Sequence, residues 1–156
     1  MARIYLKTKI YAPVAKVFDL SRSIDFHVQS AQKTKEKAIA GRTSGLIKLN
    51  ETVTWRGKHF GFYLTHQSKI TRFDALNHFT DEMIQGHFKS FKHQHNFYKM
   101  STYIEMVDII DYRLPCGFLG KIFDFIFLRK YLTKFLTSRN EFIKSHAEVS
   151  ELKKEQ

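Results

Sequence analysis

The chain is poor in the residues that interrupt or cross-link a fold. Its 156 residues include one cysteine, two prolines and seven glycines. A single cysteine excludes an internal disulfide and is typical of a reducing compartment. So few prolines and glycines exclude a linker-rich or fibrous chain, and 43% hydrophobic residues exclude disorder for the bulk of it. We therefore expect a single domain over residues 1–152 and a charged tail at 153–156.

Long apolar runs are also missing. The longest candidate, Ile122 to Leu128, has seven residues and contains Asp124, whereas about 18 apolar residues are needed to span a bilayer. The N-terminal stretch lacks the unbroken apolar segment of a signal peptide. We expect a cytoplasmic protein.

Acidic residues are scarce, with 15 against 26 basic ones and a net charge of +11. Such a charge favours an anionic partner: nucleic acid, a phospholipid surface or an acidic ligand. The cations are scattered, so we favour a solvated surface and disfavour nucleic acid. An anionic membrane stays a candidate partner, because Lys121, Arg129, Lys130 and Lys134 flank the apolar stretch from Ile122 to Leu128.

Apolar periodicity predicts the order of the elements. Alternation over residues 4–10 predicts a half-buried strand. Two short helices follow, one starting at Pro13 and one capped by Ser21 or Ser23. Five apolar runs between Leu46 and Pro115 predict an antiparallel meander. After Gly117 a period of three and four predicts one long helix, or two in line, reaching about residue 150.

Two stretches are interpreted as irregular, and one face as inward. Residues 33–45 are polar and are expected to form a loop. Gly57 and Gly61 are expected to bracket a turn or bulge. The preceding strand would turn one parity inward, namely Leu49, Glu51, Val53 and Trp55.

Together these elements predict an α+β fold, in which a curved antiparallel sheet wraps a long C-terminal helix and the interior between them can be hollow. The aromatic residues near that helix's start are expected to be mostly core, although a membrane or partner contact stays open for some. These residues are Phe118, Phe123, Phe125, Phe127, Tyr131 and Phe135.

Four segments carry a resemblance to a known superfamily. They are residues 10–19 (IYAPVAKVFD), residues 44–47 running into 51–55 (SGLI, ETVTW), residues 79–83 followed by Gly86 and 93–97 (FTDEM, HQHNF), and residues 111–117 (DYRLPCG). Over residues 3–147 the chain resembles the START-like (SRPBCC) ligand-binding proteins, which include lipid-transfer domains, plant pathogenesis-related proteins and bacterial polyketide cyclases. The resemblance implies a helix-grip fold with an apolar cavity, but not one reaction.

Strand parity places ionisable side chains on apolar faces. Asp81 shares a face with Phe79 and Met83, the pair His93 and His95 lies between Phe91 and Phe97, and Asp108 lies between Met106 and Ile110. A buried charge costs several kcal/mol unless it is paired. We therefore predict that both histidines point inward and that at least one hydrogen-bonds Asp81 or Asp108.

Three interpretations of this cluster stay open. It can be a structural network beneath a cavity, a polar end that orients a ligand, or a metal site. Two histidines at i and i+2 can share a metal, and carboxylates could complete the site, but no cysteine or third histidine has a supporting spacing. We therefore expect neither a metal nor a cofactor.

The cavity is expected to be lined by residues of inward parity or of the helix's apolar stripe: Trp55, Met83, Phe91, Phe97, Met106, Tyr112, Phe135 and Phe142. The candidate ligand-binding set adds Asp81, His93, His95, Asp108 and Arg139. Arg139 lies on the apolar face of the last helix, where it could pair with Asp108 or Glu51 or extend to solvent.

Three functions compete. We favour a non-enzymatic carrier or sensor of a hydrophobic small molecule, such as a lipid or polyketide. The second is an enzyme of the cyclase/dehydratase type, in which a histidine titrating near neutral pH and a neighbouring aspartate transfer protons. The third is a basic protein that binds membrane surfaces or nucleic acid.

Overall fold

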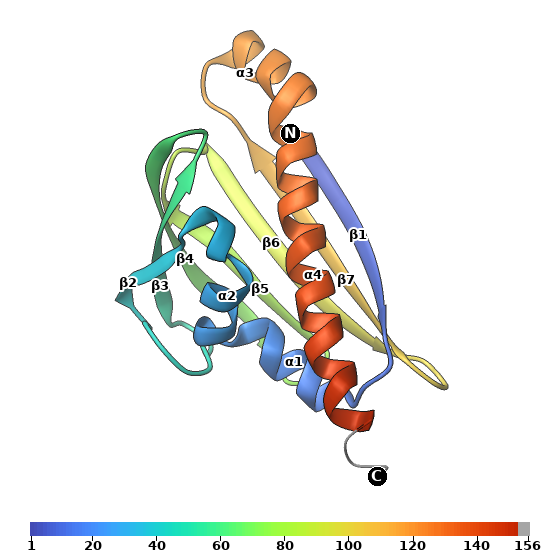
Figure 1. The fold of residues 1–156 in the computed structure, drawn as a ribbon. Coiled ribbons are helices and arrows are strands. Elements are labelled where there is room, and N and C mark those ends of the chain that lie inside the picture. The colour runs from blue at the N-terminus through green and yellow to red at the C-terminus, as the bar shows by residue number, and fades with distance from the viewer. Residues whose placement is uncertain (153–156) are drawn as a thin grey trace.

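The computed structural model describes residues 1–152, and side chains through residue 149, so the tail expected at 153–156 lies outside it. A seven-stranded antiparallel sheet curves around a long C-terminal helix (Figure 1). The strands are β1 (Ala2–Ile10), β2 (Lys37–Gly41), β3 (Thr52–His59), β4 (Phe62–Asp74), β5 (His78–Gln85), β6 (Ser90–Lys99) and β7 (Ile104–Arg113). Their spatial order is β1-β7-β6-β5-β4-β3-β2, so the first strand pairs with the last.

Helices cover the concave face of the sheet. After β1 come α1 (Val14–Arg22), α2 (Ile24–Ser30) and the short 3-10 helix η1 (Gln32–Thr34). After β7 the helix runs without a break through α3 (Gly117–Phe123), the π-helical turn η2 (Asp124–Leu128) and α4 (Arg129–Leu152). The helix-grip architecture expected from the sequence is confirmed. Ser23 is the cap of α2, because its side chain accepts a hydrogen bond from the Phe26 amide at 3.2 Å.

Local predictions fail around β2 and β3. The expected loop at residues 33–45 contains η1 and β2; β2 is a mostly exposed edge strand, so it carries no apolar alternation. Gly57 lies inside β3, and the turn that follows is built by Phe60 and Gly61, both with positive φ. Leu49 precedes β3 and is exposed, and Glu51 pairs with Arg42.

The buried residues form two apolar clusters. One packs α1, α2 and the C-terminal half of α4 against the sheet, with Phe18 in edge-on contact with three other phenylalanines. The other lies near the start of α4 and contains Ile4, Ile110, Tyr112 and Leu136. The apolar core between the sheet and the C-terminal helix is therefore divided into two parts.

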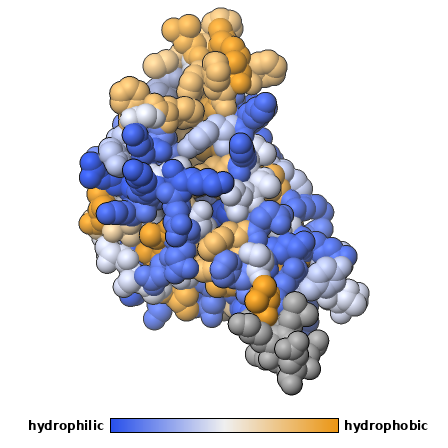
Figure 2. Space-filling view, in the orientation of Figure 1, coloured by the Kyte–Doolittle hydropathy of each residue, from blue (hydrophilic) through white to orange (hydrophobic). Residues whose placement is uncertain are grey.

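The segment formed by α3 and η2 projects beyond the end of the sheet, where the surface is strongly hydrophobic (Figures 1 and 2). Phe118, Phe125 and Phe127 are 75%, 82% and 58% exposed, so the expectation that these aromatics are core is wrong. The reason is geometric: beyond β7 there is no sheet left for the segment to cover. None of the helices in residues 1–152 is long and apolar enough to cross a membrane.

One buried contact anchors this projecting segment. Asp124, in η2, accepts a hydrogen bond from the Tyr112 hydroxyl and another from Arg129 at 2.9 Å. Burial raises the pKa of Tyr112 far above its ordinary value, and the bond to Asp124 raises it further. The phenol therefore stays a donor, which holds the π-helical turn against the end of the sheet.

Candidate functional site

A cavity of about 230 Å³ lies between the concave face of the sheet and α4, and residues of both core clusters line it. Its apolar wall comes from strands and helices alike: Ile24, Ile47, Val53, Trp55, Leu64, Ile70, Phe79, Phe88, Phe91, Leu128, Leu132, Phe135 and Leu136. Its polar lining includes Ser68, Asp81, His93, His95 and Arg139. The cavity thus combines a broad apolar wall with a few converging polar groups.

Of the eight side chains expected to line the cavity, Trp55, Phe91 and Phe135 do so. The prediction is wrong for the other five, although all but Met83 and Phe142 are buried. Helix α1 fills the end of the interior under Phe97 and Met106, where the Phe18 ring lies 5.2 Å from that of Phe97. Phe142 packs on Phe26, Tyr112 belongs to the second cluster, and the Met83 sulfur lies against Gly86.

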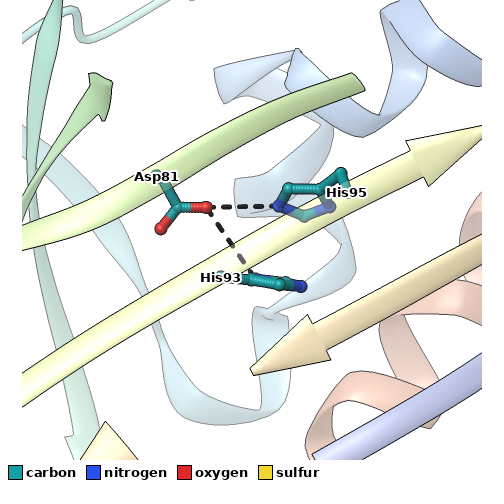
Figure 3. Close-up of side chains that lie close together, drawn as sticks. All are labelled: Asp81, His93 and His95. Carbon is teal, nitrogen blue, oxygen red and sulfur yellow. Dashed lines mark hydrogen bonds and ion pairs between the residues drawn. The ribbon is translucent and has the colours of Figure 1, made fainter. Parts of the chain in front are cut away.

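Asp81 and the two histidines meet on the cavity wall (Figure 3). Asp81 lies on β5 directly opposite His93 on β6, and His95 follows on the same face of β6. The Asp81 Oδ2 atom is 3.2 Å from His95 Nε2 and 3.8 Å from His93 Nδ1. Both imidazoles are buried, at 7% and 2% exposure. The prediction that both histidines point inward and that at least one hydrogen-bonds Asp81 or Asp108 is confirmed.

Asp108 lies behind the histidines and does not line the cavity. It sits opposite His95 on β7, is fully buried, and contacts the other nitrogen of each ring. Its Oδ1 atom is 2.8 Å from His93 Nε2 and 2.9 Å from His95 Nδ1. Asn140 on α4 donates to its Oδ2 atom at 2.7 Å. Asp108 therefore ties the histidine pair to the long helix.

Arg139 completes the cluster from α4. Of the options left open for it, the structure shows the pairing with Asp108, at 3.9 Å from Nη1 to Oδ1, and a hydrogen bond from Nη2 to the Ser21 carbonyl. The pairing with Glu51 does not occur, because Glu51 lies outside the cavity on Arg42. The Nη1 atom is buried and makes no hydrogen bond within the described residues.

The surroundings keep both carboxylates ionised. Burial alone would raise the pKa of Asp81, but the hydrogen bond from His95 and the nearby imidazoles lower it to about 2. Burial likewise opposes the charge on Asp108, yet its bonds with His93 and His95 hold its pKa well below the ordinary value. Burial, followed by the neighbouring His95 ring, lowers the pKa of His93, which favours the neutral imidazole.

Four further histidines line the same cavity and were missed by the sequence analysis. They are His27, His59, His66 and His87. Together with His93 and His95, six of the eight histidines in the chain therefore line the cavity. For His59 and His66 the signal was strand parity; His27, on α2, and His87, after the end of β5, have no such signal. Residues 53, 55, 57 and 59 of β3 and residues 64, 66, 68 and 70 of β4 all face the cavity, but interpreting Gly57 as a break ended the first series too early.

These additional groups form a second polar wall. Glu36 was also missed; it contacts His27 at 3.3 Å, and His27 lies over the Trp55 ring at 4.2 Å between centroids. His59 Nδ1 is 2.7 Å from the Tyr131 hydroxyl. Burial lowers the pKa values of His59 and His66, so both favour the neutral form.

Comparisons with solved structures identify the architecture. The protein TTHA0849 from Thermus thermophilus superposes with a TM-score of 0.77 at 12% identity, over 96% of this chain and 99% of that one. Ginseng (Panax ginseng) major latex-like protein 151 gives 0.70 at 19% identity, over 94% and 97%. The di-domain ARO/CYC protein StfQ of steffimycin biosynthesis gives 0.76 at 10% identity, over 95% of this chain and 51% of that one.

No protein-family model matches the chain, and no curated protein is significantly similar to it in sequence. The likeness to these three structures therefore shows the fold. It confirms the helix-grip architecture that the START-like (SRPBCC) resemblance implies.

Proposed function

We propose that the protein binds a hydrophobic small molecule in the cavity between sheet and α4, as a carrier or sensor. The observation that carries the proposal is the cavity itself, which has an apolar wall and a few converging polar groups, as ligand sites typically do. The fold supports it at a coarser level, because a latex-like protein and an ARO/CYC protein share it.

The size of the cavity limits the ligand. Its volume of about 230 Å³ is below the roughly 300–1,000 Å³ of sites for drug-sized molecules. It favours a compact ring compound or a short acyl chain over a two-chain phospholipid. The polar end supplies orientation: Arg139 lines the cavity, and its Nη1 atom makes no hydrogen bond among the described residues. A ligand carrying a carbonyl, hydroxyl or carboxylate oxygen at one end would satisfy it.

Trp55 provides a direct test. It is the only tryptophan, and it lines the cavity. Native mass spectrometry of freshly purified protein should detect a co-purified apolar molecule. Titration with the probe anilinonaphthalene sulfonate should quench Trp55 fluorescence saturably. Ser68→Phe should abolish the quenching, because Ser68 is buried and lines the cavity; Arg72→Phe, on the exposed face of the same strand, should not. Equal quenching in both variants would refute binding in this cavity.

An enzyme of the cyclase/dehydratase type is the second candidate. It is favoured by one observation, the 3.2 Å contact between His95 and Asp81 on the cavity wall, which suits proton transfer. Wild-type protein should then convert a poly-β-ketone surrogate to a product detectable by liquid chromatography–mass spectrometry. His95→Phe should keep binding and lose turnover. If the wild type binds the surrogate without converting it, the enzyme candidate is refuted and the carrier or sensor role remains.

We also propose that the projecting tip formed by α3 and η2 docks on an anionic membrane surface. Seven large apolar side chains of the tip are between 41% and 82% exposed: Phe118, Leu119, Ile122, Phe123, Phe125, Ile126 and Phe127. The cations Lys121, Lys130 and Lys134 are exposed beside them, and Asp124 is the only acidic residue from 114 to 140. Each such cation contributes about 1 kcal/mol at an anionic surface. The same cations would repel one another across a dimer interface.

The tip is connected to the cavity. Phe60 and Tyr131 line the cavity, and their rings lie 4.6 Å apart. Phe60 is half exposed and contacts Phe123 of the tip at 5.9 Å. A hydrophobic ligand leaving a bilayer at the tip would therefore meet an aromatic route toward the cavity.

Vesicle sedimentation tests the docking. Binding should be stronger to phosphatidylserine-containing vesicles than to pure phosphatidylcholine, and should weaken with salt. The double substitution Phe118→Ser and Phe125→Ser should abolish it. Tyr98→Ser is the control and should leave vesicle binding unchanged. Tyr98 is exposed near the end of β6, whereas it is the start of β6 that pairs with Arg113 next to the tip. Equal binding to both vesicle types, or dimerisation that covers the tip instead, would refute it.

A further inference from the structure

We infer that Asp81, His93 and His95 bind a divalent transition-metal ion at the cavity wall, with Asp108 orienting both histidines from behind. The three side chains offer one ligand atom each, all within 4.8 Å of one another. Two of the separations are 3.2 and 3.8 Å, both from Asp81 Oδ2. Donors on a tetrahedral ion with bonds of about 2.1 Å lie roughly 3.4 Å apart, so small side-chain adjustments would complete the site.

The hydrogen-bond pattern of the histidines supports this assignment. Metal-bound imidazoles typically donate the N–H of the other nitrogen to a carboxylate, which fixes the ring and its tautomer. Asp108 Oδ1 lies at that position for both rings: it is hydrogen-bonded to His93 Nε2 at 2.8 Å, and it is 2.9 Å from His95 Nδ1 in a close contact without hydrogen-bond geometry. Asp108 is itself fixed by Asn140. The arrangement thus contains three converging ligands and a buried carboxylate that is hydrogen-bonded to one of the two histidines and in close contact with the other.

The hydrogen-bond contacts of the two rings also fit a cation at this position. The two rings have four nitrogens, and each faces a carboxylate of Asp81 or Asp108. With one N–H group on each ring, the pair has two donors for these four contacts, so some contacts lack a hydrogen bond, and His95 Nδ1 indeed makes none within the described residues. If both N–H groups face Asp108, the lone pairs of His93 Nδ1 and His95 Nε2 point toward the Asp81 carboxylate, and these electron-rich groups repel one another. A metal ion between them would remove this repulsion, and Arg139 is the only guanidinium that pairs with the cluster within the described residues.

The cavity sets the coordination. Asp81, His93 and His95 line it, whereas Asp108 does not. Three protein ligands would therefore leave at least one position open to the cavity, as in metal sites that bind a substrate or water. Two imidazoles and a carboxylate suit Zn²⁺ or Fe²⁺ and disfavour Ca²⁺ and Mg²⁺, which prefer oxygen ligands. If the proposed ligand carries an oxygen at its polar end, that oxygen would take the open position, an assignment that rests on the proposed function.

Metal binding can be measured without knowing the ligand. Chelator-treated full-length protein would be titrated with ZnCl₂ by calorimetry and with CoCl₂ by visible absorption. One equivalent should bind per chain, and the Co²⁺ bands should have the intensity of a four- or five-coordinate site. Asp81→Asn and His93→Phe should each abolish binding. Asp108→Asn should keep the stoichiometry and weaken affinity about 10–100-fold.

Controls separate the site from general histidine binding and from misfolding. His78→Gln should bind like the wild type, because His78 lies on β5 but pairs with Asn96 away from the cavity lining. In the wild type, Co²⁺ should broaden the NMR signals of His93 and His95 before those of His78. This measurement needs no variant, so it tests the site even if a substituted protein fails to fold. Absence of saturable binding, or equal affinity in folded Asp81→Asn, would overturn the site. Failure of probe binding with intact Co²⁺ binding would refute only the carrier proposal.

Discussion

Asp108→Asn should destabilise the protein more than loss of any surface charge on the same strand. Asp108 is fully buried and is hydrogen-bonded to His93 and Asn140, and its Oδ1 atom lies 2.9 Å from His95 Nδ1 and 3.9 Å from Arg139 Nη1. Asparagine keeps the volume, so no cavity forms and the change isolates the charge. Removing one partner of a buried ionic network costs about 3–5 kcal/mol. For a chain of this size each kcal/mol corresponds to about 2–4 °C, so the melting temperature should fall by at least about 6 °C.

The assay is thermal unfolding followed by circular dichroism, in buffer containing a chelator so that bound metal does not contribute. Asp111→Asn is the matched control, because Asp111 lies on β7 too but pairs with Arg3, whose side chain is 62% exposed. Water can solvate Arg3 when the Asp111 charge is lost, so the melting temperature of Asp111→Asn should stay close to that of the wild type. A shift for Asp108→Asn no larger than that for Asp111→Asn would refute the view that the cluster is a tightly coupled buried network.

Three further substitutions test the fold around the site. Phe18→Ala should cost about 3–5 kcal/mol in urea unfolding, since the 2%-exposed ring packs on three other phenylalanines; a cost below that of Ser23→Ala would contradict this packing. Ser23→Ala should cost about 1 kcal/mol, because the cap of α2 is lost, and helical circular dichroism should otherwise be preserved. Gly41→Ala should destabilise more than Gly61→Ala: both have positive φ, but only at Gly41 would a Cβ lie 2.2 Å from the Thr52 carbonyl oxygen. Equal melting temperatures for the two alanine variants would contradict that close approach.

Much of the His–Asp cluster could be predicted from the sequence because β-strands have a strict period of two. Phe91 and Phe97 indicate which face of β6 is buried, and His93 and His95 must then share it. Parity also makes Asp81 a candidate neighbour of the two histidines. Its exact place opposite His93, however, depends on the register between β5 and β6, which no local spacing reveals. The same limit explains why the sequence could not show that Asp81 faces the cavity while Asp108 lies behind the rings.

The cavity boundary could not be predicted, because it depends on what fills each end of the interior. Phe97 and Met106 have inward parity, but helix α1 places Phe18 beneath them. Parity identifies residues that face the interior; it does not distinguish a packed contact from a void. The exposed tip was missed for a related reason: the aromatic pattern of residues 118–127 predicts burial, but whether the sheet extends far enough to cover it is a property of tertiary structure.

The composition of the cavity wall favours function over stability as the reason for the cluster. Apolar side chains of similar volume would fill a protein interior at least as well as a buried ionic network, and replacing such networks is often neutral or stabilising. Here two ionised carboxylates, two imidazoles and a guanidinium are held at one side of a cavity whose remaining wall is largely apolar. A solely structural network would gain nothing from four members, Asp81, His93, His95 and Arg139, lining the void. Since Asp81, His93 and His95 face it while Asp108 and Asn140 hold the rings from behind, the arrangement is better suited to presenting ligand atoms than to packing the core.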